Sequence, residues 1–421
     1  MVCSANSTAR QVNVSPVSPS ARPAVLFLTH HLPWPARSGG RLREAQLLQR
    51  LSARFDIEVV AVSKVPELDC RHVEDATRHG VRARVFAAQA GGDHNAGPLA
   101  RRHAAPAARD YLAHRLRRSP VVVHVEGHYL LGLVPERVRP VVLLVEHNIE
   151  SALFEQRAAY CTAPAERANL LREGTRTRTD EVTAWRQVRI VGAVTEEDAH
   201  AIRTAVPDAD VRYLPNGADH LSTESRPLDE AQRAAARLLF VADLRYEPNL
   251  HAARLLLEDI YPQILRRCPD VTLAIVGSDP PQWLVNAARR NPSLTVTGWV
   301  PDVAPWLDAA HVVVCPLTIG GGVKVKVLEA LARGCAIVAT PIALQGLGHL
   351  PPGAALERRD AHSIADACAH LLTCPEERDW QRARAVDAAR HLPSWDLAAD
   401  ILANTWNELA ATAAEAINAR A

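Results

Sequence analysis

A glycine-rich loop leads directly into an apolar helix in the sequence Pro316-Leu-Thr-Ile-Gly320-Gly321-Gly322-Val-Lys324-Val-Lys326-Val-Leu-Glu329-Ala-Leu-Ala-Arg-Gly334. Glycines let backbone N–H groups approach a ligand closely, and the first N–H groups of a helix have no partner within the helix. Together with the positive end of the helix dipole, these donors favour an anion. The loop is not a Walker A motif, because there the lysine follows the last glycine directly and precedes serine or threonine.

Two of the chain's three lysines, Lys324 and Lys326, stand in this loop, although the chain has 48 basic residues. Cations at a helix N-terminus oppose the dipole and cost about 0.3–1 kcal/mol each unless an anion binds. Glu329 follows among apolar neighbours, where a carboxylate needs partners, and ribose hydroxyls are suitable ones. Phosphate and sugar in one place predict a nucleotide site. The alternative is a solvated helix end.

Length, charge and cysteine usage limit the class of protein. A chain of 421 residues is long for one domain and suits two, and 48% hydrophobic residues allow sizeable cores. The net charge of +1 argues against a nucleic-acid partner. The eight cysteines form no Cys-x-x-Cys pair and no Cys/His cluster. We therefore expect reduced thiols in a cytoplasmic protein, without a zinc site.

The N-terminal residues and one basic segment bear on localisation. Residues 1–22 lack a continuous apolar run and are predicted to form a disordered leader, not a signal peptide. No segment approaches the roughly 20 apolar residues that a membrane-spanning helix needs. The segment Arg101–Arg118 holds six arginines and one acidic residue, Asp110. Its apolar side is thin, so we expect a solvated face, and peripheral membrane contact is the alternative.

Short apolar runs separated by helical patterns predict an α/β fold with parallel sheets that are covered on both faces. The predicted strands are 24–29, 57–62, 121–125, 141–145 and 190–194, then 238–242, 271–276, 294–297, 312–316 and 336–340. The main predicted helices are 41–55, 250–267, the one after the glycine loop, and 394–421. In the last helix the apolar stripe is predicted to comprise Leu397, Ile401, Leu402, Trp406 and Leu409.

Turn residues in Leu214-Pro-Asn-Gly-Ala218 mark the predicted boundary between two domains. We expect two doubly wound, Rossmann-like domains that face a central cleft. The first comprises residues 23–217 together with the C-terminal helix 395–421, and the second comprises residues 218–394. Such sheets bind ligands at the carboxyl ends of their strands.

Taken together, these features resemble those of the retaining glycosyltransferases of family 4 (glycosyl transferases group 1), which have the GT-B fold. The resemblance covers about residues 24–400. The matching stretches, in order, are Pro33-Trp-Pro-Ala-Arg-Ser-Gly39-Gly40-Arg-Leu-Arg43, His124-Val-Glu126, His147-Asn-Ile-Glu150, Thr195-Glu-Glu-Asp198, Pro215-Asn-Gly217, Phe240-Val-Ala-Asp-Leu-Arg-Tyr246-Glu-Pro248-Asn249, Ile275-Val-Gly277, Gly298-Trp-Val300-Pro-Asp302, Pro316 to Ala330, and Val338-Ala-Thr340 to Gly346-Leu.

The resemblance implies an enzyme that moves a sugar from a nucleoside-diphosphate donor to an acceptor hydroxyl with retention at the anomeric carbon. It implies that the first domain binds the acceptor and the second the donor, with no cofactor besides the nucleotide sugar and no metal ion. The residues expected to bind the donor are Gly39, Gly40, Arg245, Asn249, Gly277, Val300, Gly320, Gly321, Gly322 and Glu329. The residues expected to act in catalysis are Lys324, Lys326, His147 and Glu126.

The sequence departs from the family pattern at three places. Gly321 stands where the family has the first glutamate of its donor signature, so backbone N–H groups would meet the donor sugar there. Asp243 and Asn249 stand where the family has an arginine and a lysine. Glu126 stands where the family has a histidine, which leaves His147 as the nearest candidate.

Two other functions remain open from the sequence. A nucleotide-sugar epimerase can share this fold, but it needs acid and base groups around the sugar, and Gly321 removes one carboxylate. A non-catalytic protein that binds nucleotide sugars and assists an active relative is the second alternative. The acceptor, whether a small molecule, a lipid-linked intermediate or a polysaccharide, is not identified by the sequence.

Overall fold

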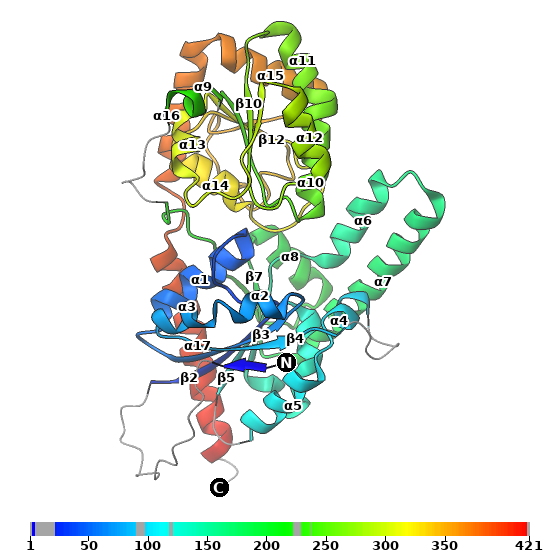
Figure 1. Cartoon of the computed structure of the whole chain (residues 1–421). Coiled ribbons are helices and arrows are strands. Elements are labelled where there is room, and N and C mark those ends of the chain that lie inside the picture. The colour runs from blue at the N-terminus through cyan, green and yellow to red at the C-terminus, as the bar shows by residue number, and fades with distance from the viewer. Residues whose placement is uncertain are drawn as a thin grey trace. The chain divides into compact units, whose positions relative to one another are not determined.

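The structure is a computed structural model that describes residues 2–4, 22–89, 97–117, 121–221, 229–235 and 237–418. These residues divide into two compact units. Unit 1 is Met1–Pro215 with Asp396–Ala421, and unit 2 is Asn216–Trp395. In each unit a twisted sheet lies between helices (Figure 1), as the alternation of apolar runs and helical patterns predicts.

The sheet of unit 1 has eight strands in the order β1-β4-β3-β2-β5-β6-β7-β8. All neighbouring strands are parallel except β1, which pairs antiparallel with β4. The strands are β1 (Val2–Ser4), β2 (Ala24–Thr29), β3 (Asp56–Ser63), β4 (Arg82–Ala87), β5 (Val122–Glu126), β6 (Val142–Glu146), β7 (Ile190–Ala193) and β8 (Val211–Tyr213). The predicted disordered leader is therefore wrong for Val2–Ser4. Residues 5–21 lie outside the described part of the chain.

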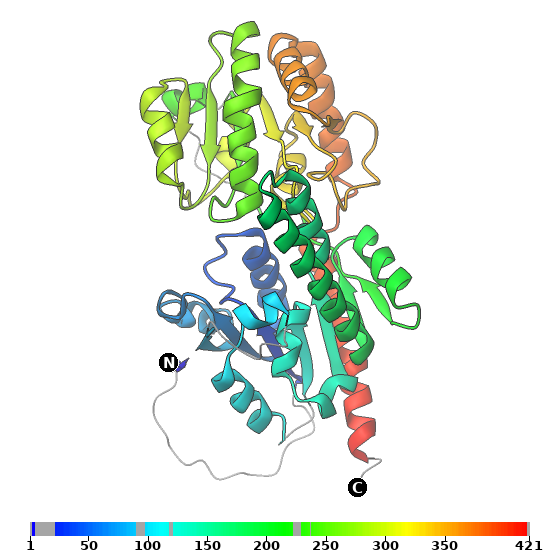
Figure 2. The ribbon, with the colours of Figure 1, turned by 90° about the vertical axis from the view of Figure 1, so that its right-hand side faces the viewer.

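The helices of unit 1 cover both faces of this sheet, and α6 and α7 form a hairpin (Figure 2). They are α1 (Gly39–Leu51), α2 (Pro66–Cys70), α3 (Val73–Arg78), α4 (Pro98–Arg102), α5 (Pro106–Arg115), α6 (Glu150–Tyr160), α7 (Pro164–Gln187) and α8 (Glu196–Ala205), with the 3-10 helices His128–Leu133 and Glu136–Val141.

Unit 2 has a six-stranded parallel sheet in the order β11-β10-β9-β12-β13-β14. Its strands are β9 (Leu238–Val241), β10 (Leu273–Val276), β11 (Leu294–Val296), β12 (Val312–Cys315), β13 (Ile337–Ala339) and β14 (Leu356–Glu357). Its helices are α9 (Glu230–Ala235), α10 (Glu247–Leu255), the π-helical turn Leu256–Ile260, α11 (Tyr261–Arg267), α12 (Gln282–Arg290), α13 (Ala304–Ala309), α14 (Val325–Ala332), α15 (Ala361–Thr373) and α16 (Pro375–Ala389).

The strand order decides where a ligand can bind. In unit 2 the chain first adds strands on one side of β9 and then returns to add β12 on the other side. In unit 1 the same reversal occurs between β2 and β5. At such a reversal the loops after the two central strands diverge, and this leaves a crevice at the carboxyl ends of the strands.

The last helix, α17 (Trp395–Asn418), packs on unit 1. Trp406 is fully buried, and its ring meets that of Phe55 edge-on with 5.1 Å between centroids. Leu402 and Leu409 are also buried, but Leu397 is 50% exposed. Including Leu397 in the buried stripe was wrong, since the buried side at this turn is formed by small residues, Ala398 and Ala399 among them.

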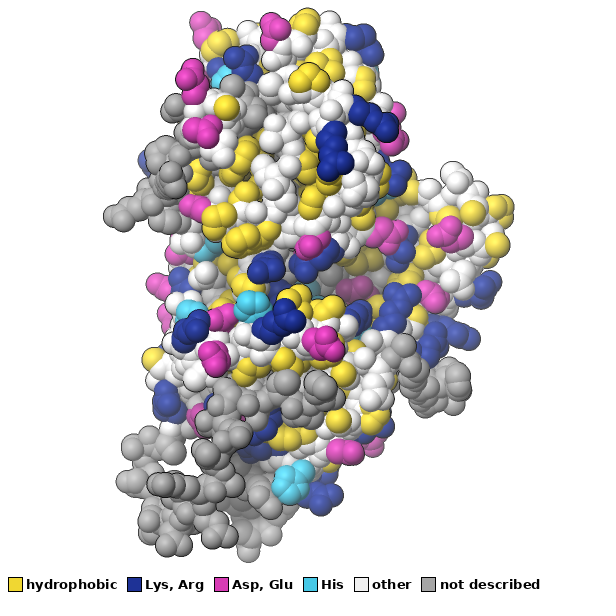
Figure 3. Space-filling model, viewed as in Figure 1, with side chains coloured by type: hydrophobic (Ala, Val, Ile, Leu, Met, Phe, Trp, Pro, Cys, Tyr) yellow, Lys and Arg dark blue, Asp and Glu magenta, His cyan; other side chains and the backbone are white. Residues whose placement is uncertain are grey.

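The surface agrees with the near-neutral composition. Basic and acidic side chains are interspersed over the face that Figure 3 shows. Among the described residues, no helix combines the length and the apolar character that crossing a membrane requires.

Candidate functional site

The glycine loop lies at the strand reversal of unit 2, between β12 and α14. Gly322 has φ of 60°, in the left-handed region that glycine adopts without strain. Lys324 is the N-cap residue of α14, and Val325 is its first helical residue. The loop therefore aims the helix N-terminus at the crevice beyond the strands, as the sequence predicts.

Lys324 is not a solvated residue. It is only 7% exposed, and its Nζ donates to the carbonyl oxygen of Gly322 at 2.8 Å and to Oε1 of Gln345 at 3.3 Å. A buried ammonium beside a helix N-terminus carries a large electrostatic cost unless an anion offsets it. This rules out the alternative of a solvated helix end for Lys324.

Lys326 reaches across the strand reversal to the helix after β9. Its Nζ donates to Oδ1 of Asn249 at 2.7 Å and lies 4.9 Å from the ring centroid of Phe240. Burial lowers its pKa, and no acidic side chain pairs with it among the residues that the structure describes. Asn249 is fixed in turn, because its Nδ2 donates to the carbonyl oxygen of Asp243 at 2.8 Å. The ammonium group of Lys326 therefore lies beside Asn249, the position at which the resembling family has a lysine.

Glu329 lies on α14 and is 9% exposed. Its Oε1 is 2.9 Å from Nε2 of His220, and Nδ1 of His220 accepts a hydrogen bond from Nε1 of Trp395 at 3.2 Å. The sequence analysis gave no role to His220. No local signal reveals it, since it lies 109 residues from Glu329 along the chain.

Three other predicted donor residues have structural roles that the sequence did not indicate. Arg245 forms hydrogen bonds to both carboxylate oxygens of Asp243, at 3.0 and 2.9 Å, so much of its charge is already offset. A Cβ on Gly277 would lie 1.6 Å from the carbonyl oxygen of Ala242, so only glycine fits between the ends of β9 and β10. Val300 is partly buried against the hydrophobic core of unit 2.

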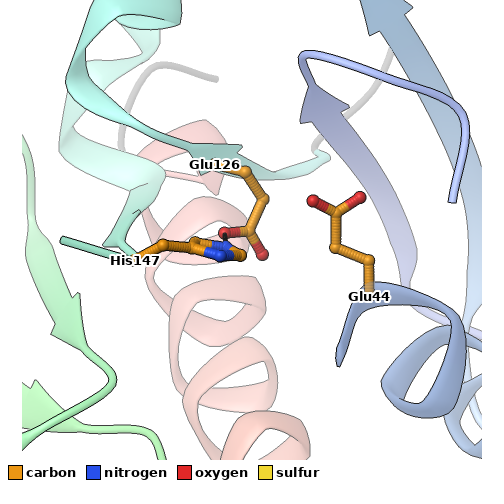
Figure 4. A group of neighbouring side chains, drawn as sticks. All are labelled: Glu44, Glu126 and His147. Atoms are coloured by element: carbon orange, nitrogen blue, oxygen red, sulfur yellow. Dashed lines mark hydrogen bonds and ion pairs between the residues drawn. The ribbon is translucent and has the colours of Figure 1, made fainter. Parts of the chain in front are cut away.

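Glu126 and His147, the predicted catalytic residues of unit 1, lie beside each other near its own strand reversal (Figure 4). Glu126 is the last residue of β5, and His147 follows β6. Oε1 of Glu126 is 2.8 Å from Nε2 of His124, and its other oxygen hydrogen-bonds to Nε2 of His147. Trp406 donates to Nδ1 of His124 at 3.1 Å, which leaves Nε2 of His124 as the donor to Glu126.

The pKa shifts of Glu126 and His147 favour an ion pair between these two side chains. Burial alone would raise the pKa of Glu126, but His147 and His124 hold it well below its usual range. Burial alone would lower the pKa of His147, but the charge of Glu126 and the hydrogen bond to it raise this pKa overall. A histidine that is held and oriented by a carboxylate in this way can hydrogen-bond to a hydroxyl through its other ring nitrogen.

Gly39 and Gly40 begin α1, which points its N-terminus at the same group. A Cβ on Gly40 would lie 3.8 Å from Nδ1 of His147 and from Cε1 of His31, so the glycine backbone packs beside both imidazoles. The structure therefore places these two predicted residues in unit 1, next to His147.

Glu44, Glu126 and His147 could together hold a metal ion. One ligand atom from each lies within 4.8 Å of the others. However, Glu44 already accepts a hydrogen bond from Thr29 at 3.0 Å, and Glu126 is engaged by two imidazoles. The α1 N-terminus also opposes a cation here. The group fits a neutral hydroxyl better than a divalent ion.

Comparison with known proteins supports this description. Residues 235–374 match the family of glycosyl transferases group 1. The chain is 31% identical over 243 residues to phosphatidyl-myo-inositol mannosyltransferase of Mycobacterium tuberculosis, an alignment that covers 54% of this chain and 62% of the relative. The matched part thus spans less than two thirds of that relative's length.

Solved structures show the same fold over nearly the whole chain. HepE of Anabaena, in complex with UDP, has a TM-score of 0.64 at 14% identity, over 91% of this chain and 100% of that one. Sucrose-phosphate synthase of Thermosynechococcus elongatus has a TM-score of 0.65 at 16% identity, over 93% and 100%. The chain therefore has the GT-B fold, and its residues 235–374 match the model of the glycosyl transferases group 1 family.

Proposed function

We propose that the protein is a glycosyltransferase that transfers a sugar from a nucleoside-diphosphate donor to an acceptor hydroxyl with retention of the anomeric configuration. The observation that carries this proposal is the group formed by the glycine loop, Lys324 and Lys326 at the strand reversal of unit 2. It lies within the matched residues 235–374. It combines the N-terminus of α14 with two ammonium groups, and both favour a diphosphate.

The proposed reaction depends on stabilising the negative charge that develops on the leaving group. As the bond from the anomeric carbon to the diphosphate breaks, negative charge builds on the departing phosphate. Lys326 donates only to the neutral amide of Asn249 among the described residues, so its charge is available to that phosphate. Preorganised groups of this kind stabilise the transition state without reorganising during the reaction. In a retaining reaction the leaving phosphate can take the proton of the acceptor on the same face of the sugar.

Unit 1 is proposed to bind the acceptor. His147, oriented by Glu126, offers a hydrogen-bonding group for a hydroxyl at the carboxyl edge of its sheet. The mannosyltransferase relative acts, by its name, on phosphatidyl-myo-inositol, and HepE was solved with UDP. A polyol acceptor and a uridine or guanosine donor are therefore the first to test.

We further propose that transfer needs no metal ion, because Lys324 and Lys326 supply the cationic charge that a metal would provide. Treatment with EDTA should leave the rate unchanged. A loss of activity that Mn²⁺ or Zn²⁺ restores would contradict this proposal, and Glu44, Glu126 and His147 would then be the first candidate ligands to substitute. A cytoplasmic location is proposed from the cysteines, since those that the structure describes are all free thiols.

A thermal-shift screen with UDP-, GDP-, ADP- and dTDP-sugars tests the donor, because stabilisation follows occupancy. Product analysis then separates the candidate functions. An epimerase would convert the nucleotide sugar without an acceptor, whereas a transferase would give at most slow hydrolysis. Binding without turnover against a broad acceptor panel would favour a non-catalytic role.

A further inference from the structure

His220 is a buried histidine outside the residues already given a role in donor binding. It lies just after the start of unit 2, and its side chain is 5% exposed. It contacts two groups that come from distant parts of the sequence, the carboxylate of Glu329 on α14 and the indole of Trp395. All three residues belong to unit 2.

The contacts fix the tautomer of this imidazole. The indole nitrogen of Trp395 is only a donor, so Nδ1 of His220 must accept at 3.2 Å. The ring proton therefore lies on Nε2, which donates to Oε1 of Glu329 at 2.9 Å. The backbone of Trp395 is fixed as well, because its N–H donates to Oδ1 of Asp219 at 2.7 Å.

This chain of hydrogen bonds engages one oxygen of Glu329 only. No partner of Oε2 occurs among the residues that the structure describes, although Glu329 is nearly buried. A carboxylate that is held through one oxygen keeps the other oriented for a ligand hydroxyl. On α14 this oxygen stands one turn beyond Lys326, where the sugar of a nucleotide bound through its diphosphate would lie.

We propose that His220, oriented by Trp395, is a positioning residue that aims Glu329 at the ribose hydroxyls of the donor nucleotide. The inference rests on the proposed function. It predicts that His220 acts on recognition of the ribose and not on the chemical step, because ribose contacts are equal in the ground and transition states.

The test compares two amide substitutions that differ by one methylene group. The amide of His220→Gln can take the place of Nε2 and still donate to Glu329, whereas that of His220→Asn is too short to do so. The affinity of each protein is measured by calorimetry for whichever of UDP, GDP or ADP stabilises the native protein most, and for its 2′,3′-dideoxy counterpart. In the native protein the dideoxy compound should bind about tenfold more weakly, as expected for hydrogen bonds to a carboxylate.

The expected result is that His220→Gln keeps this discrimination, while His220→Asn and Glu329→Ala lose most of it. KM for the donor should rise in His220→Asn with kcat little changed. Should His220→Asn fail to fold, Trp395→Phe, which keeps an aromatic ring but removes the donor to Nδ1, should still weaken the discrimination. Undiminished discrimination in the folded His220→Asn or Trp395→Phe protein would refute the role of His220 while leaving the proposed function intact. If none of the three nucleotides binds the native protein, the proposed function itself fails.

Discussion

The strand reversals of the two units differ in how the charge of their central side chain is compensated. In unit 1, Glu126 is held between His124 and His147, so its negative charge is matched within the protein. In unit 2, Lys326 donates to the amide of Asn249, and no described acidic side chain pairs with it. The lesson is that one fold can form two kinds of site at the same topological position.

The ligands proposed for the two sites account for this difference in charge compensation. A buried cation without a matching anion is costly in the empty protein, and a bound diphosphate relieves that cost. A compensated ion pair, by contrast, gains little from a charged ligand but can exchange hydrogen bonds with a hydroxyl. We therefore expect substitutions in unit 2 to act on the donor and those in unit 1 to act on the acceptor.

The largest expected effect concerns the stability of unit 1. Trp406→Ala should lower the free energy of unfolding by about 3–5 kcal/mol, because it empties a fully buried site and removes the donor to His124. Urea unfolding measures the loss. Leu397→Ala on the same helix is the matched control and should change stability by less than about 0.5 kcal/mol. Equal losses in both variants would contradict the packing described here.

The second effect concerns the ammonium group of Lys326. Lys326→Met keeps an apolar stem over Phe240 but removes the charge, and it should lower kcat about 100-fold while weakening donor binding less. Lys326→Arg should also be impaired, because a larger, planar guanidinium group replaces a compact ammonium group. The control is Lys64→Ala, which alters the chain's third lysine, an exposed residue of unit 1. Near-native turnover in Lys326→Met would show that Lys326 does not stabilise the diphosphate.

The third effect tests whether the unit 1 group acts on the acceptor. Glu126→Gln preserves shape but removes the charge that orients His147 and raises its pKa. We expect kcat to fall by about 100-fold, which is the size of effect that misplacing a reacting group by about 1 Å can have, with donor affinity unchanged. Steady-state kinetics at saturating donor and calorimetry with the nucleotide separate the two quantities. A change in nucleotide affinity with kcat unchanged would instead indicate that Glu126 acts on the donor, and would contradict the assignment of the acceptor to unit 1.

The smallest effect is a pH dependence of stability in unit 1. Burial alone would lower the pKa of His128, but Glu146 raises it to about 9. Because the pKa in the unfolded chain is about 6.5, this stabilisation is fully present below pH 6.5 and is lost as the pH rises through about 9. The melting temperature should fall by several degrees between pH 7 and 9, and His128→Asn, whose amide can take the place of Nδ1 and still donate to Glu146, should flatten the curve. A native profile that is flat over this range would contradict the ion pair.

Most of the sheet was predictable because a strand buried on both faces is a run of apolar residues. The predictions missed β4, β8 and β14 for reasons that can be read from the sequence. Strand β4 is Arg-Ala-Arg-Val-Phe-Ala, with two arginines in its first half, while β8 has three residues and β14 has two. Short or charged strands carry too few apolar residues to stand out from loops.

The glycine loop, both lysines and Glu329 were predictable from the sequence alone, because they are neighbours along the chain and their chemistry depends on local backbone. Their partners were not. Asn249 lies 77 residues from Lys326, His220 lies 109 from Glu329, and Trp406 lies 282 from His124. Parallel sheets join distant segments at one edge, so only the folded chain decides which side chains meet there. The sequence by itself therefore placed the glycine loop, the two lysines and Glu329 together, and the tertiary structure decided which distant side chains they contact.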